Sequence, residues 1–409
     1  MTATAPSSSS SAGDPSDLTA RTECIDGAGV DLLAFAGDDG VLFERAGAGL
    51  AGRGVALRVE AAHVGESLAA IAVDDEVGLP GCGPVAVGAM PFLPDDRATM
   101  IVPRTILGRA LDGTTWMTTI GPEPALAAPS PAGTRPPDRF TLIAARPHDE
   151  WLDVIGDAIA EIRAGRLRKM VLAREVTVEA NRPILPTHVA ARLRALYPSC
   201  MLFSVEGFVG ASPELLVSRQ GLEVRSQPMA GTIPRSGDPK VDDQLAATLM
   251  SSRKDRLEHR LVVDAVAGAL SPCCQVLDVP SEPSIVPLRN VCHLGTTITG
   301  SLTEPGRSAW DLAAMLHPTP AVAGTPTDDA LACIAAIERL DRGRYAGPVG
   351  WVDARGDGEW AVGIRSAQIS GSRARLLAGV GVVADSDPEA ELAETQLKLQ
   401  ALLAAVVRP

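Results

Sequence analysis

The chain has 409 residues, and its 46% hydrophobic content is enough for the core of one large domain or two ordinary ones. Its 37 Lys and Arg residues against 50 Asp and Glu residues give a formal charge of −13, which argues against nucleic acid or an anionic membrane surface as partner. No apolar run approaches about 18 residues, and the seven cysteines show no CxxC spacing and follow no signal segment, so we expect a cytoplasmic protein with reduced thiols.

The first part of the chain is predicted to be a scaffold of strands. Residues 1–15 are rich in serine and are predicted to form a disordered tail. Over residues 16–145, apolar runs alternate with Gly, Pro and Asp turns, a pattern typical of an antiparallel sheet; the runs are 30–36, 55–59, 85–91, 99–102 and 140–145. A helix is expected near 64–73, and the Pro- and Ala-rich residues 121–137 are predicted to be a connecting loop.

Residues 146–409 are predicted to mix helices with strands and to hold the functional residues. The helices are expected at 150–164, 187–196, 238–270 with a break near 251, 328–340 and from 388 onward. The strands are expected at 168–178, 201–209, 210–217, 290–300 and in a meander over 347–353, 359–369 and 373–384. Residues 228–235 and 316–326 are predicted to be loops.

Two charged side chains in this part stand at positions that suit a functional group. The strand pattern places Lys169 on the same side as Val171 and Ala173, and a lysine desolvated on such a face can serve as a base. Glu214 follows Pro213, which cannot donate to a sheet, so its carboxyl group stands where strand pairing resumes. Ordinary structure also accounts for both positions, as an edge-strand lysine that blocks aggregation and as a turn residue.

Acidic side chains recur on two predicted helices that are far apart in the sequence. Residues 386–398 are predicted to form the first turns of a helix, on which Glu391, Glu394 and Lys398 share one face. Carboxylates one turn apart repel each other unless a cation lies between them, and oxygen ligands suit Mg²⁺ better than zinc. Glu258 abuts the buried stripe of its own helix and is a candidate to share that metal. The alternative is a solvated acidic face near a helix N-terminus.

Small residues surround an arginine in the predicted meander. Arg365 is expected to share its strand face with Ala361, Gly363 and Ala367, and Gly379 opens space on the next strand. An arginine with only small side chains around it has room to bind a carboxylate. Close packing between strands is the alternative explanation.

Six runs, in their order along the chain, resemble the chorismate-utilising enzyme family, and within it the isochorismate synthases. The runs are Gly-Ala-Ser-Pro-Glu-Leu-Leu at 210–216, Lys-Asp-Arg-Leu-Glu-His at 254–259, His-Pro-Thr-Pro-Ala-Val at 317–322, Tyr-Ala-Gly-Pro-Val-Gly-Trp at 345–351, Gly-Asp-Gly-Glu-Trp at 356–360 and Ser-Asp-Pro-Glu at 386–389. The resemblance covers roughly residues 147–405, and the N-terminal part fits only in length and general strand content. It implies an α+β fold in which large antiparallel β-sheets stack as a sandwich with helices packed outside.

The resemblance also implies roles for individual residues and Mg²⁺ as cofactor. Lys169 matches the base that activates water, and Glu214 matches the acid that protonates the departing hydroxyl. Glu258 and Glu391 match direct magnesium ligands, with Glu394 as a water-mediated or alternative ligand. The positions that match substrate-binding residues are Tyr345, Arg365, Gly379 and Lys398 for the carboxylates, Ala321 and Val322 for the pocket wall, and His293 for orienting the ring carboxylate or the leaving group.

The implied reaction is the isomerisation of chorismate to isochorismate, by addition of water at C2 and loss of the C4 hydroxyl, for menaquinone or siderophore biosynthesis. Relatives that add ammonia carry glutamine in place of Lys169, and aminodeoxychorismate synthases often have a nucleophilic lysine in the loop that here holds Ala230. Salicylate synthases share the lysine but usually lack the His-Pro-Thr-Pro run, which makes them the nearest alternative; a non-catalytic chorismate-binding relative is the other. Ala323 and Leu377 depart from residues common in isochorismate synthases.

The partners that these observations imply are few. We expect chorismate as the small-molecule substrate, no nucleic acid, no membrane and no glutaminase subunit, and a monomer or weak dimer.

Overall fold

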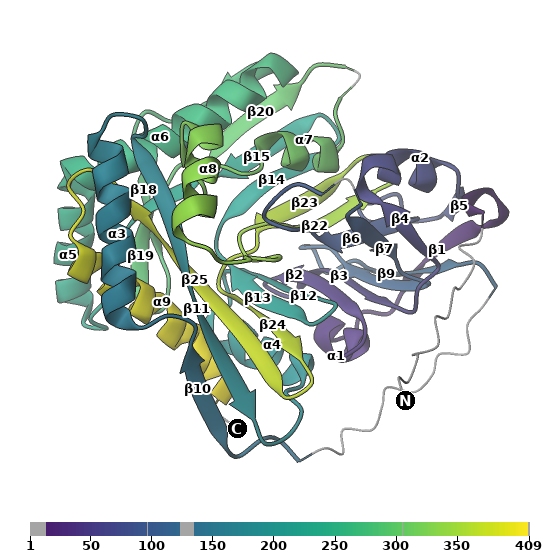
Figure 1. Ribbon diagram of the computed structural model, residues 1–409. Coiled ribbons are helices and arrows are strands. Elements are labelled where there is room, and N and C mark those ends of the chain that lie inside the picture. The colour runs from purple at the N-terminus through teal and green to yellow at the C-terminus, as the bar shows by residue number, and fades with distance from the viewer. Residues whose placement is uncertain (1–13, 96, 123–134, 305, 408–409) are drawn as a thin grey trace, which may run out of the picture.

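The computed structural model describes residues 14–95, 97–122, 135–304 and 306–407 (Figure 1). The predicted disordered tail lies almost entirely outside these residues, and so does most of the predicted loop at 121–137. The described chain forms large sheets with helices on their outer faces, so the predicted α+β class is confirmed.

The largest sheet combines strands from both halves of the chain. Within the described residues it has 13 strands. In spatial order they are β10 (Phe140–Ala144), β11 (Lys169–Ala180), β25 (Arg373–Val382), β24 (Ser366–Ser370), β13 (Phe208–Ser212), β12 (Met201–Val205), β2 (Val41–Arg45), β3 (Ala48–Arg53), β8 (Thr105–Arg109), β9 (Thr115–Ile120), β1 (Thr19–Ile25) and β5 (Ala72–Asp75), with β21 (Gly324–Thr325) paired to β11. Neighbours run antiparallel, except that β1 and β5 are parallel.

Two further sheets complete the strands of the described residues. The nine-stranded sheet runs β17 (Cys274–Asp278), β20 (Ile298–Leu302), β15 (Glu223–Gln227), β14 (Leu215–Gln220), β23 (Gly358–Val362), β22 (Pro348–Asp353), β6 (Val85–Ala89), β7 (Thr99–Val102) and β4 (Leu57–Glu60). The three-stranded sheet runs β16 (Met229–Pro234), β19 (Val291–Gly295) and β18 (Ser284–Pro287). Because β2 pairs with β12 and β6 with β22, the strands before residue 145 extend the sheets built by the rest of the chain.

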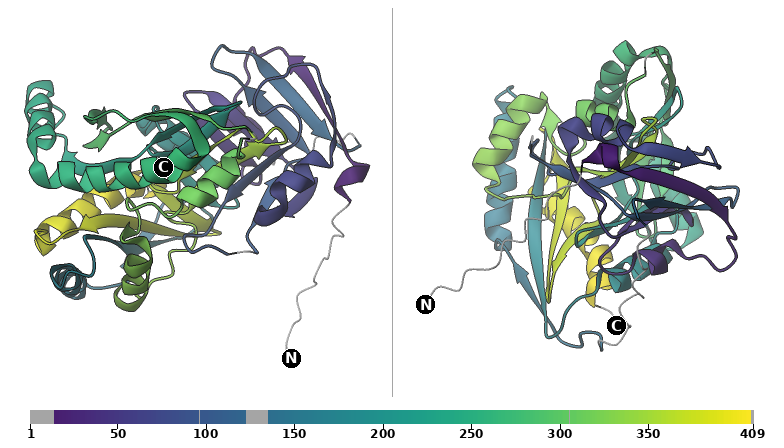
Figure 2. Two further views of the ribbon diagram at one scale, coloured as in Figure 1. Left: turned by 90° about the horizontal axis from the view of Figure 1, so that it is seen from above. Right: turned by 90° about the vertical axis from the view of Figure 1, so that its right-hand side faces the viewer.

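The helices cover the outer faces of these sheets (Figures 1 and 2). Helices α3 (His148–Arg163), α8 (Thr327–Ile337) and α9 (Pro388–Val407) pack over β11 and β25, and α1 (Leu32–Ala36) and α4 (Pro186–Leu196) over β2, β3, β12 and β13. Helices α5 (Pro239–Ser251) and α6 (Arg253–Leu270) cover the three-stranded sheet, and α7 (Ala309–Leu316) covers β14, β22 and β23. The remaining helical segments are α2 (Val64–Ala69), η1 (Pro15–Asp17), η2 (Ala61–His63) and η3 (Ser271–Cys273).

Strand alternation divides the apolar residues between two cores. On β12, Phe203 belongs to the core between the two large sheets, whereas its neighbour Leu202 belongs to the core under α1, α4 and α9. This follows from the period of two along a strand, and each such fully buried side chain contributes roughly 1.5–3 kcal/mol. No helix in the described part of the chain has the length and apolar character needed to cross a membrane.

Two expected elements take a different form in the structure. Residues 30–36 were expected as a strand, but Leu32–Ala36 form α1, because the Asp31 carboxylate accepts hydrogen bonds from the backbone amides of Leu33 (3.0 Å) and Ala34 (3.3 Å) and caps a helix there. Residues 228–235 were expected as a loop but form β16, whose register shifts at Gly231 where φ is +77°. A bulge at this glycine lets the strand keep its pairing with β19.

The predicted strand at 359–369 is also wrong. The chain forms β23 in the nine-stranded sheet, leaves it after Val362 and enters β24 in the 13-stranded sheet at Ser366. Arg365 lies between the two strands with φ at +53°, so it does not share a strand face with Ala361, Gly363 and Ala367. Its side chain is positioned by the crossing from one sheet to the other.

Candidate active site

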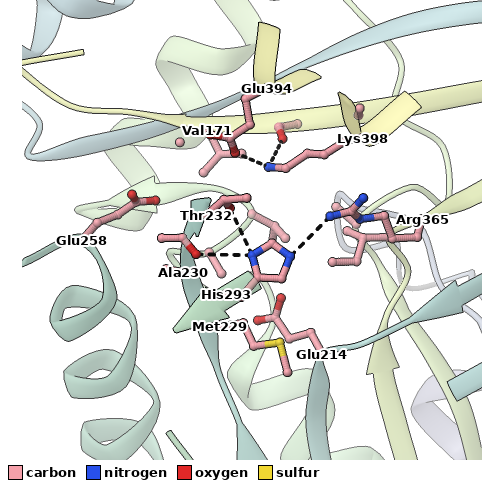
Figure 3. A pocket seen from close by; sticks show the side chains of 18 of the residues that line it. Val171, Glu214, Met229, Ala230, Thr232, Glu258, His293, Arg365, Glu394 and Lys398 are labelled. Atoms are coloured by element: carbon pink, nitrogen blue, oxygen red, sulfur yellow. Dashed lines mark hydrogen bonds and ion pairs between the residues drawn. The ribbon is translucent and has the colours of Figure 1, made fainter. Parts of the chain in front are cut away.

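A cavity of about 1020 Å³, open to solvent, lies where the three sheets approach α6 and α9. Residues from distant parts of the sequence face one another across it (Figure 3). All twelve residues that the sequence singled out line this cavity: Lys169, Glu214, Glu258, His293, Ala321, Val322, Tyr345, Arg365, Gly379, Glu391, Glu394 and Lys398. The tertiary structure therefore brings the whole predicted set together.

Lys169 projects into the cavity from the first residue of β11, and its side chain is only 1% exposed. This strand lies inside the sheet, with β21 on one side of its start and β25 on the other, so Lys169 is not the edge-strand lysine considered as the alternative. Its ammonium donates to Oε1 of Glu258 on α6 at 2.9 Å. The pair joins the 13-stranded sheet to the helix that covers the small sheet.

Gly381 on β25 makes room for this ion pair. A Cβ atom at this position would lie 2.5 Å from Glu258 Oε1 and 2.9 Å from Lys169 Cε, closer than van der Waals contact allows. The same strand contributes Gly379, where a Cβ would lie 3.1 Å from the Tyr345 hydroxyl. These glycines are needed because side chains from other elements occupy the space above the strand.

We expect Gly381→Ala to lower the catalytic rate of this site roughly 10- to 100-fold, because the added methyl group displaces the Lys169 and Glu258 side chains from their positions in the cavity. Steady-state kinetics and a thermal melt would check this. Gly268→Ala on α6 is the matched control, since a methyl group added there meets no described side chain or neighbouring element within 4 Å, and it should leave activity unchanged. Equal loss of activity in the two variants would contradict the assignment of this space to the Lys169–Glu258 pair.

The two glutamates of α9 that line the cavity are also paired with lysines. Lys254 donates to Glu391 at 3.3 Å, and Lys398 donates to Glu394 at 2.6 Å. Lys398 also donates to the backbone carbonyl of Gly379 at 2.9 Å. Burial raises the pKa of Glu391, whose side chain is 5% exposed. The charge of Lys254 opposes this shift and so favours the ionised form of Glu391.

The carboxylates fit a hard divalent cation by the chemistry of their donors. Glu258, Glu391 and Glu394 offer only oxygen and lie on two helices that face one cavity, the set that Mg²⁺ prefers. Among the described residues, no three His, Cys, Asp or Glu side chains are yet gathered closely enough to coordinate an ion. In the structure each of the three glutamates is paired with a different lysine instead.

Two cavity residues next to Glu258 were not singled out from the sequence. Lys254 and Asp255 both line the cavity from the first turn of α6. Burial raises the pKa of Asp255, and the nearby charges of Glu258 and Glu394 raise it further, which marks a concentration of negative charge. The spacing of Asp255 and Glu258, one helical turn, is the same as that of Glu391 and Glu394 and could have identified it.

Glu214 lies across the cavity between β13 and β14, and it is 5% exposed. Burial raises the pKa of its carboxyl group to about 7, against the opposing effects of a hydrogen bond from the Met229 backbone and the charges of Lys169 and Lys398. A carboxyl group with this pKa is protonated in part of the molecules at neutral pH, as a general acid must be.

His293 on β19 is a neutral, hydrogen-bonded histidine. Arg365 Nη2 lies 3.3 Å from Nε2, and because a guanidinium only donates, Nε2 is the acceptor and Nδ1 carries the proton. Nδ1 lies 3.3 Å from the Gly231 carbonyl and 3.0 Å from the Thr232 hydroxyl. Burial, together with the charges of Arg365 and Lys398, lowers the pKa of His293 to about 3. His293 therefore orients Arg365 and does not supply a proton.

Arg365 and Tyr345 offer hydrogen-bond donors to an anion. Burial lowers the pKa of the Arg365 guanidinium. No carboxylate of the described residues lies within ion-pair distance of this guanidinium, whose side-chain contact is with His293. Burial raises the pKa of Tyr345 to about 12, so its phenol remains protonated. Leu377 and Ala323 are the two residues that differ from those common in the resembled family. Leu377 lines the cavity, whereas the Ala323 carbonyl accepts a hydrogen bond from the Val171 amide at 2.8 Å.

The fold and this cavity define a class of protein. The profile described as chorismate binding enzyme matches residues 123–407, and the chain belongs to this family. A relative from Mycobacterium tuberculosis, provisionally named isochorismate synthase MenF, is 42% identical over 345 residues, which cover 80% of this chain and 87% of that protein. Isochorismate synthase DhbC of Bacillus subtilis is 44% identical over 269 residues, covering 63% and 68%. The structure of MenF, the menaquinone-specific isochorismate synthase from Escherichia coli, superposes with a TM-score of 0.83 at 27% identity, over 96% of this chain and 95% of that one.

Proposed function

We propose that this chain is an isochorismate synthase that converts chorismate to isochorismate with Mg²⁺. The observation that carries the proposal is a buried amine, Lys169, and a buried carboxyl group whose pKa is about 7, Glu214, lining one cavity. The family, and relatives whose names state this activity at 42–44% identity, support it.

In this mechanism the two residues exchange one hydroxyl for another. Lys169, in its neutral form, takes a proton from water as the water oxygen bonds to C2 of the ring. The C4–oxygen bond breaks as both ring double bonds shift by one position, and protonated Glu214 gives its proton to the leaving hydroxyl, which departs as water. The proton on Lys169 then replaces the one that Glu214 lost, so the net change is an isomerisation. A base and an acid each contribute about 10²- to 10⁴-fold in such reactions.

The cations of the cavity hold the two carboxylates of chorismate. Arg365 presents a guanidinium that His293 orients and that no described carboxylate neutralises, so it suits bidentate binding of one carboxylate. Lys398 and the Tyr345 hydroxyl extend this donor set. Val322 and Ala321 line the wall with small apolar surface. Because Ala230 carries no amine, the cavity has no nucleophile at that position to trap the ring.

Glu258, Glu391 and Glu394 would hold Mg²⁺, which when bound supplies positive charge for the ring carboxylate of the substrate. The lysine partners of these glutamates would then be released, and Lys169 would no longer donate to Glu258. This release would free the amine of Lys169 for its role as base.

We expect Glu258→Gln to weaken Mg²⁺ binding at least 10-fold, because one of three anionic donors is lost. Isothermal titration calorimetry with MgCl₂ measures this without relying on turnover. Removal of the metal with EDTA should abolish turnover of the unaltered protein, and added Mg²⁺ should restore it. Glu389→Gln, an exposed acid in the first turn of α9 that does not line the cavity, is the control. A variant that binds Mg²⁺ as well as the unaltered protein would rule out Glu258 as a ligand.

The reaction itself is tested by incubating the purified protein with chorismate and Mg²⁺ and separating the products by chromatography. Isochorismate as the main product is the expected result. Salicylate with an equal amount of pyruvate would instead establish the salicylate synthase alternative, and unchanged chorismate would establish a non-catalytic binding protein. We further propose that the reaction takes place in the cytoplasm, without a glutaminase subunit, and feeds menaquinone or siderophore synthesis.

A further inference from the structure

A second cavity, of about 690 Å³ and open to solvent, lies beside α7 and the segment that follows β6. Its wall is mostly apolar and includes Met90, Pro91, Trp310, Ala314, His317 and Pro348. None of these six residues lines the active-site cavity. A concave, mostly apolar surface with a few polar groups is the kind of site that binds a small organic molecule.

His317 gives this cavity a polar group. Its Nε2 lies 2.8 Å from the Phe92 carbonyl, and because a carbonyl only accepts, Nε2 carries the proton. Burial lowers the pKa of His317 to about 4, so the ring is neutral at pH 7 and Nδ1 is an acceptor. Within the part of the chain that the structure describes, no group donates to Nδ1. A hydroxyl group of a bound molecule can do so.

Trp310 gives the cavity an aromatic wall. Its ring centroid lies 4.9 Å from that of the buried Trp360, with 48° between the planes, and this contact fixes the indole. Trp310 itself is only half-buried. An aromatic ligand can pack against the rest of its surface at an advantage over an aliphatic one of equal area.

Phe92 connects this cavity to the active site. Its ring meets His317 edge-on at 6.1 Å, and the guanidinium of Arg342 lies 4.3 Å from its centroid. Arg342 lines the active-site cavity and donates to the carbonyls of Val171 (2.8 Å) and Val322 (2.9 Å), which line it too. His317 also begins the short segment that leads to Val322. A shift of His317 or Phe92 therefore reaches the active site through direct contacts.

We propose that the second cavity binds a small aromatic molecule with one hydroxyl group, and that its occupancy changes the affinity of the active site for chorismate. The hydroxyl donates to His317 Nδ1, and the ring packs on Trp310. The coupling requires only that the ligand favours one arrangement of His317 and Phe92 over another.

The binding step is tested with 2-naphthol by isothermal titration calorimetry. Ala314 is exposed on α7 and lines the cavity, so Ala314→Phe fills the space without altering the core. This variant should bind 2-naphthol at least 10-fold more weakly, whereas Ala247→Phe at an exposed position on α5 should bind it as the unaltered protein does. 2-Methoxynaphthalene, which lacks the donor, should bind the unaltered protein at least fivefold more weakly than 2-naphthol.

The coupling step is tested by titrating chorismate with and without saturating 2-naphthol. The affinity for chorismate should change at least fivefold in the unaltered protein and in Ala247→Phe, and should not change in Ala314→Phe. Undiminished binding of 2-naphthol to Ala314→Phe would place it elsewhere, such as in the active-site cavity, and would overturn the proposal. Binding in the second cavity without any change in chorismate affinity would overturn the coupling. Both readouts are binding measurements, so neither depends on which reaction the enzyme catalyses.

Discussion

Replacing Lys169 by alanine is expected to lower kcat for chorismate by about 10³-fold, because the base that accepts the proton of water is lost. Lys169→Arg is the sharper variant. It keeps a cation beside Glu258, but a guanidinium does not release its proton in proteins, so this variant should be as inactive as Lys169→Ala. Stopped-time product assays measure both.

Folding must be checked in these variants, because Lys169→Ala leaves the Glu258 carboxylate without the partner it has at 2.9 Å. Circular dichroism and thermal melts in Mg²⁺ provide this check. Lys240→Ala, at an exposed site on α5, is the control and should retain full activity. A folded Lys169→Arg protein with more than a tenth of the original kcat would show that another group acts as the base.

Replacing Glu214 by glutamine is expected to lower kcat by about 10²- to 10⁴-fold, since the amide cannot protonate the leaving hydroxyl.

The unaltered enzyme should also lose activity as pH rises above 7, because the pKa of Glu214 is about 7 and its acid form disappears there. A plot of log kcat/KM against pH should fall with a slope near −1 above that point. Activity that stays level between pH 7 and 9 would exclude Glu214 as the acid.

The same carboxyl group makes stability depend on pH. Its pKa is 4.5 for the free group and about 7 in the fold, so the folded state binds the extra proton between these values and stability falls as pH rises through them. The cost amounts to roughly 3 kcal/mol above pH 7. Glu214→Gln should therefore gain stability relative to the unaltered protein between pH 4.5 and 8, as measured by urea unfolding. Glu223→Gln, at an exposed site on β15, should show no such gain.

Local sequence patterns predicted elements well where one pattern was strong. The spacing of Trp151, Ile155 and Ile159 predicted α3, which buries those residues. A helix was expected from residue 388 onward, and α9 does begin there, with the Asp387 carboxylate accepting a hydrogen bond from the Ala390 amide at 3.0 Å. Patterns failed where tertiary contacts outweighed them. Gly231 suggested a loop, but pairing with β19 extends the chain there as a strand with a bulge.

The roles of the site residues were assigned from the family resemblance, and all twelve residues line one cavity. Sequence spacing alone left Lys169 and Glu214 with ordinary structural alternatives, because burial depends on which strands lie on either side. The structure places β21 and β25 beside Lys169, and this removes the edge-strand alternative. Lys254 was not predicted because nothing in the sequence shows that its side chain reaches Glu391 on α9, whereas the one-turn spacing from Glu258 could have identified Asp255.

The sequence by itself determined the chemical groups available to the reaction: an amine, a set of carboxylates and an arginine, at positions that match the family. Only the tertiary structure decided their pairing, such as Lys169 with Glu258 and Lys254 with Glu391, and the shift of the Glu214 pKa to about 7. The reason is physical. Coulombic attraction and desolvation depend on distance and burial, which the separation of residues along the chain does not specify.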